Sequence, residues 1–277
     1  MTKIVLFSDK QKLFFIYEEI MKEEEINKAR AIYYKIFSSF FVYTKDSDRY
    51  FNLLNLLNIV RENPLNDSSK EALENILKKL QKDSNVVLLQ EYDDIFDNPH
   101  TAQVRTTASY YHEGIESGRK RVEMQNFLAK TKIRRDEKVY SDYEDNIGFI
   151  FTVLNELCEL QAKGYDEYKS TVHCIFEQIL NEFVDEFSKE LYEHNSSDIY
   201  KDVIVVLKAF IEFERLYLEV SKPIIKQKPS ISKKEESISE EEKERRARNK
   251  AMKALGPKNN QDESCPVFVA SNVEDDI

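Results

Sequence analysis

The sequence predicts an all-α protein, and three features of its composition favour helices over strands. Gly and Pro, the residues that interrupt helices most strongly, number only 5 and 6 among 277 residues. Charged residues make up 33% of the chain and apolar residues 41%, a balance typical of amphipathic helices with one buried face. Apolar residues also recur every three or four positions along most of the chain. We therefore expect a multi-helix single globular domain of about nine to eleven helices at 1–222.

The first part of the chain contains five predicted helices. Residues 8–43 indicate two helices with a break near 23–25, and residues 46–61 form a third that ends before Asn63-Pro64. Polar residues that favour helix starts open a fourth helix at 67 or 68 and a fifth at 83 or 84, which ends near Pro99. A polar loop rich in Thr, Ser and Tyr follows at 100–118, and loops of this length are often functional.

The second part contains helices at 116–133, 141–160 and 166–194, and a last core helix that Ser197 caps and Pro223 ends. The helix at 141–160 has the clearest start, because Ser141 and Glu144 match a capping box. Its apolar residues step by three or four and so predict one buried stripe. The last helix is apolar on nearly all sides, which predicts a central position.

Charge divides the chain into an acidic body and a mixed tail. The net charge is −10, and residues 1–225 carry all of it because the excess charges of 226–258 and 259–277 cancel. The segment 223–277 has few large apolar residues, so we expect a charged, mostly disordered tail with at most a lone helix at 239–255. An acidic body repels nucleic acid and attracts cationic peptides.

Motifs for catalysis and for cofactors are missing from the sequence. It contains no GxSxG elbow, no GxxxxGK[ST] phosphate loop and no GxGxxG turn. His173 and Cys174 are adjacent on a predicted helix, so they point about 100° apart and do not face one metal ion. We therefore expect no enzyme activity, no cofactor and no metal site, and a nucleotide hydrolase is disfavoured.

Targeting signals are also missing, and the cysteines indicate a reducing compartment. The apolar run at the N-terminus is too short for a secretory signal, and no segment reaches the roughly 18 apolar residues of a membrane span. The three cysteines form no CxxC pair. These features predict a cytoplasmic protein without stable membrane association.

Three motifs in the middle of the chain occur together in a fixed order. The first, at 92–99, is YDDIFDNP and has the form Y-x-x-[LI]-F-x-x-P; the second is Ser109-Tyr110-Tyr111; the third is Glu144-Asp145-Asn146-Ile147-Gly148. In an acidic, all-helical chain, this order resembles the TorD-type redox-enzyme maturation chaperones, which include the DmsD and NarJ types. The third motif departs from the family form E-x-D-H-I-G, because it lacks the intervening residue and has Asn146 in place of His.

The resemblance implies a cytoplasmic chaperone that binds the twin-arginine signal peptide and the apoprotein of a molybdenum-cofactor oxidoreductase until the cofactor is inserted. A formate dehydrogenase is one candidate client, and the chaperone is expected as a monomer or homodimer. Carboxylates would bind the two guanidinium groups beside an aromatic groove. The residues expected to bind the client are Tyr92, Phe96, Ser109, Tyr110, Tyr111, Glu144, Asp145 and Asn146.

Two alternatives remain open on the sequence alone. The chain could instead be a helical adaptor or scaffold protein that acts through its charged C-terminal tail. In that case, deletion of 226–277 would abolish partner binding, whereas a maturation chaperone would keep it. Purely structural roles are also open for Tyr92, Phe96 and Ser109, and acidic residues such as Glu144 often stabilise helix starts without any further function.

Overall fold

The computed structural model describes residues 9–43, 45–137, 140–223 and 248. The chain divides into two units, Met1–Pro223 and Ile224–Ile277, and the hydrophobic core lies in the first. The regular secondary structure of the described residues is helical, with one isolated β-bridge, so the predicted all-α class is confirmed. The predicted tail at 223–277, with its helix at 239–255, lies almost entirely outside the described residues.

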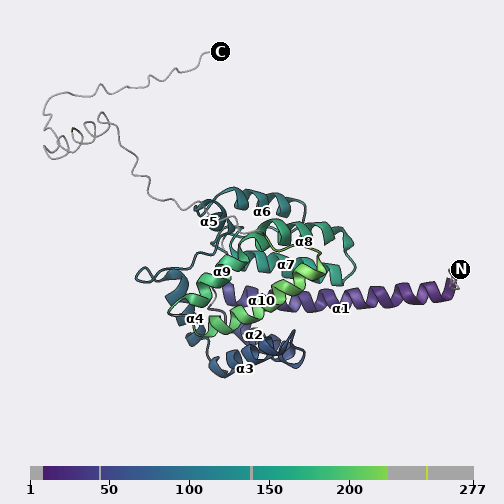
Figure 1. Ribbon diagram of the computed structural model, residues 1–277, viewed down its shortest axis with the longest axis horizontal. Helices are drawn as coiled ribbons and strands as arrows, with labels where there is room; N and C mark the ends of the chain where they lie inside the picture. The colour runs from purple at the N-terminus through teal and green to yellow at the C-terminus, as the bar shows by residue number, and fades with distance from the viewer. Residues whose placement is uncertain (1–8, 44, 138–139, 224–247, 249–277) are drawn as a thin grey trace, which may run out of the picture. The chain divides into compact units, whose positions relative to one another are not determined.

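Most of the helices follow one another closely, with longer connections at 98–107 and 130–146, and Figure 1 shows their arrangement. In chain order they are α1 Asp9–Phe41, α2 Ser47–Glu62, α3 Asp67–Lys79, α4 Val86–Tyr92, η1 Asp93–Asp97, α5 Ala108–Glu113, α6 Arg119–Ala129, α7 Ile147–Ala162, η2 Asp166–Tyr168, α8 Lys169–Ile175, η3 Phe176–Leu180, α9 Asn181–Glu193 and α10 Ile199–Tyr217. The segments η1 and η3 are π-helical and η2 is a 3₁₀ turn.

The N-terminal helix α1 is continuous, and the predicted break near 23–25 is wrong. This stretch consists of Lys, Glu, Ile, Asn and Ala, which include the strongest helix formers, and neither Gly nor Pro interrupts it. An ion pair between Glu24 and Lys28, one turn apart, supports the helix there. Figure 1 accordingly shows α1 as a single purple helix.

The core is aromatic and is centred on the pair of helices α1 and α7, which make the most extensive contact in the domain. The ring of Phe151 on α7 lies 5.5 Å from that of Phe37 and 5.9 Å from that of Phe41. Phe210 of α10 packs on the same cluster, 4.9 Å from Tyr34 in an edge-on arrangement. All five side chains are fully buried. Such ring pairs each add about 0.5–1.5 kcal/mol beyond the area they bury.

The last helix, α10, begins at a carboxylate supplied by another helix. Glu91 of α4 accepts hydrogen bonds from the backbone amides of Asp198, Ile199 and Tyr200 at 2.7, 3.0 and 3.0 Å. The predicted cap by Ser197 is wrong, since its hydroxyl has no hydrogen-bond partner among the described residues. A charged acceptor satisfies the free amides of a first turn better than a hydroxyl does.

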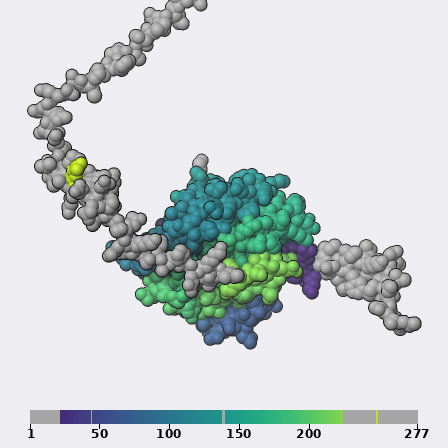
Figure 2. Space-filling view, turned by 45° about the horizontal axis from the view of Figure 1, so that its top comes forward, coloured from purple at the N-terminus to yellow at the C-terminus, as the bar shows by residue number. Residues whose placement is uncertain are grey.

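One side of α10 is exposed, although its apolar sequence predicts a central helix. Lys208, Glu212 and Leu216 follow each other at intervals of four and form an exposed stripe, in which Leu216 is 81% exposed. In Figure 2 the yellow-green end of the domain lies at the surface of the molecule, between the teal helices and the blue α3. The remaining faces of α10 pack against α3 and α9.

A buried ion pair joins α1 to α10. The Arg30 guanidinium donates to both carboxylate oxygens of Glu214, through Nε at 2.7 Å and Nη2 at 2.8 Å. Tyr34 donates to the same carboxylate at 2.8 Å. The side chains of Arg30 and Glu214 are 1% and 0% exposed, and the guanidinium also lies 4.6 Å from the centre of the Tyr217 ring. This bidentate geometry satisfies two charges that would otherwise be very costly to bury.

We expect the Arg30→Met substitution to lower the free energy of unfolding by about 3–5 kcal/mol, because Glu214 would remain buried without its partner. The double substitution Arg30→Met with Glu214→Leu should recover much of the loss, since it removes both charges. Urea unfolding followed by circular dichroism measures both values. Equal losses in the single and double variants would show that the pairing of the charges is not what matters at this position.

Candidate functional site

Two of the three sequence motifs lie side by side in the structure. Thr107 and Asn146 form an antiparallel β-bridge. Next to it, the amide of Ala108 donates to the carbonyl of Asp145 at 2.9 Å, and the amide of Ile147 donates to the carbonyl of Thr106 at 2.8 Å. The segment before α5 is therefore fastened to the segment before α7, although about forty residues separate them.

Asp145 is completely buried at this junction and holds the start of α5. One of its carboxylate oxygens, Oδ2, accepts from the backbone amide of Ser109 at 2.9 Å, while Oδ1 has no hydrogen-bond partner among the described residues. Burial raises the pKa of Asp145, and the hydrogen bonds from Ser109 oppose that rise. Ser109 in turn accepts from the amide of Arg121 at 3.2 Å and so links α5 to the first turn of α6.

Glu144 is held by two arginines of its own chain. Its carboxylate accepts from Nε of Arg121 at 2.7 Å and from Nε of Arg135 at 3.1 Å. Partial burial alone would raise the pKa of Glu144, but the hydrogen bond and the positive charge of Arg121 lower it to about 2. The guanidinium of Arg121 also lies 4.3 Å from the centre of the Tyr143 ring. Glu144 is thus ionised and fixed.

The predicted capping box of Ser141 and Glu144 is wrong, because α7 begins at Ile147 with Asn146 as its cap. The side-chain oxygen of Asn146 accepts from the amide of Gly148 at 2.8 Å and from the hydroxyl of Tyr140 at 3.0 Å. Glu144 pairs with the guanidinium groups instead, since these bonds between charges are stronger than one to a backbone amide. The N-cap of α7, Asn146, is therefore the residue at the position where the family motif has His.

Gly148 is required by the close approach of α7 to the end of α1. A Cβ atom at this position would lie 2.4 Å from the backbone oxygen of Phe41. This distance is far shorter than a carbon–oxygen contact allows, and backbone atoms cannot turn away as a side chain can. The glycine of the third motif thus explains how the junction sits directly against the aromatic core.

The aromatic residues of the first two motifs pack on different helices. Tyr92 of α4 lies 4.7 Å from Phe96 and 5.3 Å from Tyr43, measured between ring centres. Tyr111 of α5 stacks on Phe183 of α9, 5.4 Å away, and its hydroxyl donates to Glu190 at 2.8 Å. Tyr110 is half-buried, with the guanidinium of Arg105 at 5.6 Å from its ring centre. Tyr92, Phe96 and Tyr111 are less than 9% exposed.

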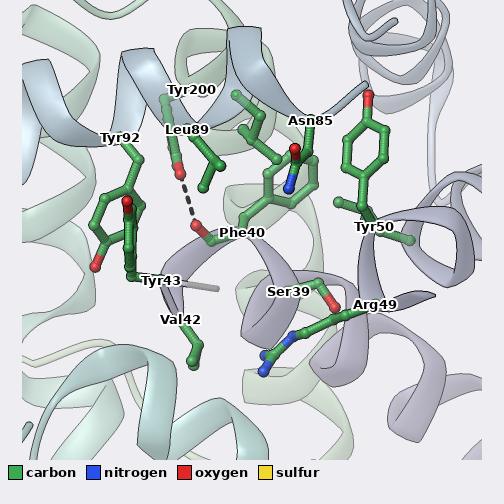
Figure 3. A pocket seen from close by; sticks show the side chains of 12 residues that line it. Ser39, Phe40, Val42, Tyr43, Arg49, Tyr50, Asn85, Leu89, Tyr92 and Tyr200 are labelled. Atoms are coloured by element: carbon green, nitrogen blue, oxygen red, sulfur yellow. Dashed lines mark hydrogen bonds between the residues drawn. The ribbon is translucent and has the colours of Figure 1, made fainter. Parts of the chain in front are cut away.

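A hollow of about 350 Å³, including its opening to solvent, lies beside Tyr92. The end of α1, the first turns of α2, the helix α4 and Tyr200 of α10 form its walls, and Figure 3 shows the side chains that line it. In this view Tyr43 and Tyr92 lie next to each other on one side, while Arg49 approaches from α2. Arg49 donates to the carbonyl of Ser38 at 2.9 Å, and burial lowers its pKa.

Three carboxylates act electrostatically on the hydroxyl of Tyr92. Burial raises the pKa of Tyr92, and the negative charges of Asp142, Asp97 and Asp93 raise it further. Partial desolvation also raises the pKa of Asp97 and of Asp142, and each is raised further by a neighbouring carboxylate, Asp93 for Asp97 and Asp97 for Asp142. The positive charge of Arg135 opposes the rise at Asp142. All three aspartates keep a solvent-exposed part, and among the described residues no direct ion pair joins them to a basic side chain. We call Asp93, Asp97 and Asp142 the aspartate cluster.

The sequence prediction therefore found part of this region and missed another part. It included Tyr92 but not Tyr43, just after α1, or Arg49 of α2, both of which are distant in sequence. The available signal was the first motif itself, in which Asp93 lies next to Tyr92 and Asp97 about one turn further on. Asp142 reaches Tyr92 only because the junction brings its loop there.

The described part of the chain contains neither a membrane span nor a metal site. None of its helices combines the length and the hydrophobicity needed to cross a bilayer. Among the same residues, no group of three or more His, Cys, Asp or Glu side chains is placed so that it could hold a metal ion.

Comparison with known proteins relates the middle of the chain to one sequence family. The family described as nitrate reductase delta subunit matches residues 62–189, a stretch that includes all three motifs. The chain is therefore similar to this family over that stretch, which is the family type that the three motifs predict.

A crystal structure of a proposed redox enzyme maturation protein from Archaeoglobus fulgidus aligns with 67% of this chain and 93% of its own, with 22% sequence identity and a TM-score of 0.44. No curated protein sequence matches the chain significantly.

We expect the Glu144→Gln substitution to flatten the acid side of the stability profile. The pKa of Glu144 in the folded protein, about 2, lies below the ordinary value of 4.5. Its stabilising contribution is therefore complete above the ordinary pKa and is lost as pH falls toward 2. At neutral pH the variant should be less stable by roughly 1.5–3 kcal/mol, the usual value for hydrogen bonds to charged groups.

Urea unfolding between pH 7 and acid conditions measures this difference, with Glu156→Gln on the exposed face of α7 as the control. A difference between wild type and Glu144→Gln that stays constant as pH falls would show that Glu144 does not titrate with a lowered pKa.

Proposed function

We propose that this protein is a cytoplasmic chaperone for the maturation of a molybdenum-cofactor oxidoreductase. It binds the twin-arginine signal peptide and the apoprotein of its client until the cofactor is inserted, and it acts by binding rather than by catalysis. The match of residues 62–189 to the nitrate reductase delta subunit family supports the general role. The observation that carries the proposed site is the aspartate cluster, whose carboxylates act on the buried hydroxyl of Tyr92 and are in no direct ion pair, close to the hollow that Tyr43 and Tyr92 line.

A twin-arginine leader fits this surface because it combines two guanidinium groups with an apolar stretch. Guanidinium groups form strong hydrogen bonds with carboxylates and also stack on tyrosine rings. The ring of Tyr43 is 39% exposed and is therefore accessible to a ligand. The apolar stretch of the leader would lie across the mouth of the hollow, whose walls include Val42, Leu53 and Leu88.

The aspartate cluster is favourable for a cationic ligand for an energetic reason. The raised pKa values of Asp97 and Asp142 mean that ionisation of the cluster is opposed by burial and by like charges. A bound arginine would neutralise this repulsion, so part of the binding free energy comes from strain that the free protein already contains. Glu144, by contrast, is already neutralised by Arg121 and Arg135.

We propose an indirect role for several residues predicted to touch the client. Glu144, Asp145, Asn146 and Ser109 fix the junction, and the junction positions the loop that carries Asp142. Nδ2 of Asn146 supports this assignment, because it donates to Oδ2 of Asp142 at 3.3 Å. Tyr92 would form part of the wall of the hollow and Phe96 would pack against Tyr92, while Tyr110 and Tyr111 would support α5 against α9.

We expect replacement of Asp93, Asp97 and Asp142 by Asn to weaken the binding of a synthetic twin-arginine leader about tenfold, since each exposed charge pair contributes roughly 0.2–1 kcal/mol. The loss should be greatest at low salt, because salt screens exposed charges. Isothermal titration calorimetry with the purified protein measures the affinity.

The matched control replaces Glu71, Glu156 and Glu193 by Gln, which changes the net charge equally at exposed positions on α3, α7 and α9. Equal affinities of the cluster variant and the control would place the leader elsewhere on the protein. A leader in which both arginines are replaced by Gln should bind the cluster variant and the wild-type protein alike.

The client can be identified by purifying the tagged protein from the cytosol of its own cells and analysing bound chains by mass spectrometry. We expect the precursor of a molybdenum enzyme with its twin-arginine leader, for which a formate dehydrogenase is a candidate. Partners without such a leader, lost on deletion of 226–277, would favour an adaptor function.

A further inference from the structure

A second, larger hollow of about 1840 Å³, open to solvent, lies between α1, α2 and α7. Three buried polar residues lie in its wall, Asn27, Asn155 and Gln161. Because each of them carries a side-chain amide, we call this hollow the amide groove. It shares no lining residue with the hollow beside Tyr92. The proposed leader site therefore leaves this groove unexplained.

Asn155 is the residue that points to a ligand. It lies in the middle of α7 and is only 5% exposed, yet its side-chain oxygen Oδ1 has no hydrogen-bond partner among the described residues. A buried acceptor without a partner costs about 1–3 kcal/mol, and an apolar side chain of similar size would avoid that cost. A donor from a bound molecule would supply the missing hydrogen bond.

Asn27 and Gln161 add hydrogen-bond donors to the same groove. The side-chain oxygen of each accepts from Nη1 of Arg30, at 2.8 Å for Asn27 and 3.3 Å for Gln161. This orientation directs the oxygens to Arg30 and leaves the two NH₂ groups as donors. The groove thus offers an acceptor and donors that are all uncharged.

The charges around the groove indicate a ligand with little net charge. Acidic and basic side chains alternate along its walls and nearly balance: Glu23, Glu24, Glu159 and Asp166 against Lys28, Lys35 and Lys163. Lys28 is already paired with Glu24. A nucleotide would bring several negative charges next to four carboxylates, and a cationic leader would meet three lysines. Small and aliphatic residues complete the wall, among them Ile32, Leu56 and Ala162.

We propose that the amide groove binds an extended, unfolded polypeptide through its backbone. A peptide backbone presents alternating N–H donors and C=O acceptors without charge, and side-chain amides can pair with both. Asn155 accepts from a backbone amide of the ligand, Asn27 and Gln161 donate to its carbonyls, and the aliphatic residues contact its side chains. Since backbone groups are common to all sequences, this binding does not depend on a particular sequence.

The amide groove and the hollow beside Tyr92, which we call the leader hollow, lie along one face of α1. Ile32 and Lys35 line the groove, Ser39 and Val42 line the hollow, and these positions are three or four residues apart. Ile32 and Ser39, both on α1, are seven residues apart, a distance of about 10 Å, which an extended chain spans with about three residues. If the proposed leader site is correct, one client chain can therefore occupy both hollows.

The test uses the full-length protein and reduced, carbamidomethylated α-lactalbumin as a permanently unfolded probe. This acidic chain is repelled by the aspartate cluster, so its binding reports on the groove. We expect Asn155→Leu to weaken its binding about tenfold, to leave the melting temperature unchanged or raised, and to leave the affinity for the leader unchanged. Asn126→Leu on α6, the same exchange at an exposed position, is the control. Fluorescence anisotropy and thermal unfolding supply the measurements.

A second variant, Ala162→Trp, fills the groove from the last residue of α7 without altering Asn155, and we expect the same loss of binding. Unchanged binding of the unfolded probe to both variants would overturn the proposal. It would also be overturned if Asn155→Leu lowered the melting temperature, or if GTP displaced the probe from the wild-type protein. Because leader binding is measured separately with the aspartate cluster variant, failure at one hollow does not imply failure at the other.

Discussion

The buried pairing of Arg30 with Glu214 is the interaction on which the arrangement of the domain depends. It connects the helix at the beginning of the described chain with the one at its end, and through Gln161 it reaches α7 between them. The same guanidinium fixes Asn27 and Gln161, which line the amide groove. The buried guanidinium of Arg30 therefore has two roles. It holds three helices together, and it orients the polar side chains in the wall of the amide groove. Removing it would disturb both functions at once.

The distribution of carboxylates separates structural residues from those available to a ligand. Glu144 and Glu91 are bound by groups of the chain itself, the first by guanidinium groups and the second by the backbone amides of α10. Asp97 and Asp142 of the aspartate cluster have raised pKa values, and no direct ion pair joins the cluster to a basic side chain among the described residues. Sequence position does not reveal this difference, because Asp142 and Glu144 are two residues apart, yet the pKa of the first is raised and that of the second is lowered.

The sequence was sufficient for the all-α class, because Gly and Pro are scarce and apolar residues keep helical spacing. It was also sufficient for the family resemblance, because three short motifs occur in a fixed order within the stretch that the family model matches. The sequence was insufficient where a residue far away in the chain determines a local feature, such as the cap of a helix. The cap of α7 moved from Ser141 to Asn146 because Arg121, more than twenty residues earlier, binds Glu144. The cap of α10 moved from Ser197 to Glu91, which lies over a hundred residues away. The missing partner of Asn155 is visible only when its surroundings are known.

The position of Glu91 directly before Tyr92 has a thermodynamic consequence. One turn of α4 carries both residues, so the helix that lines the leader hollow is also the helix that closes the first turn of α10. Any molecule that binds the native hollow and not the unfolded chain stabilises the folded state by mass action. Occupancy of the hollow would then be transmitted to the last core helix, and the resistance of α10 to unfolding would report whether a client is bound.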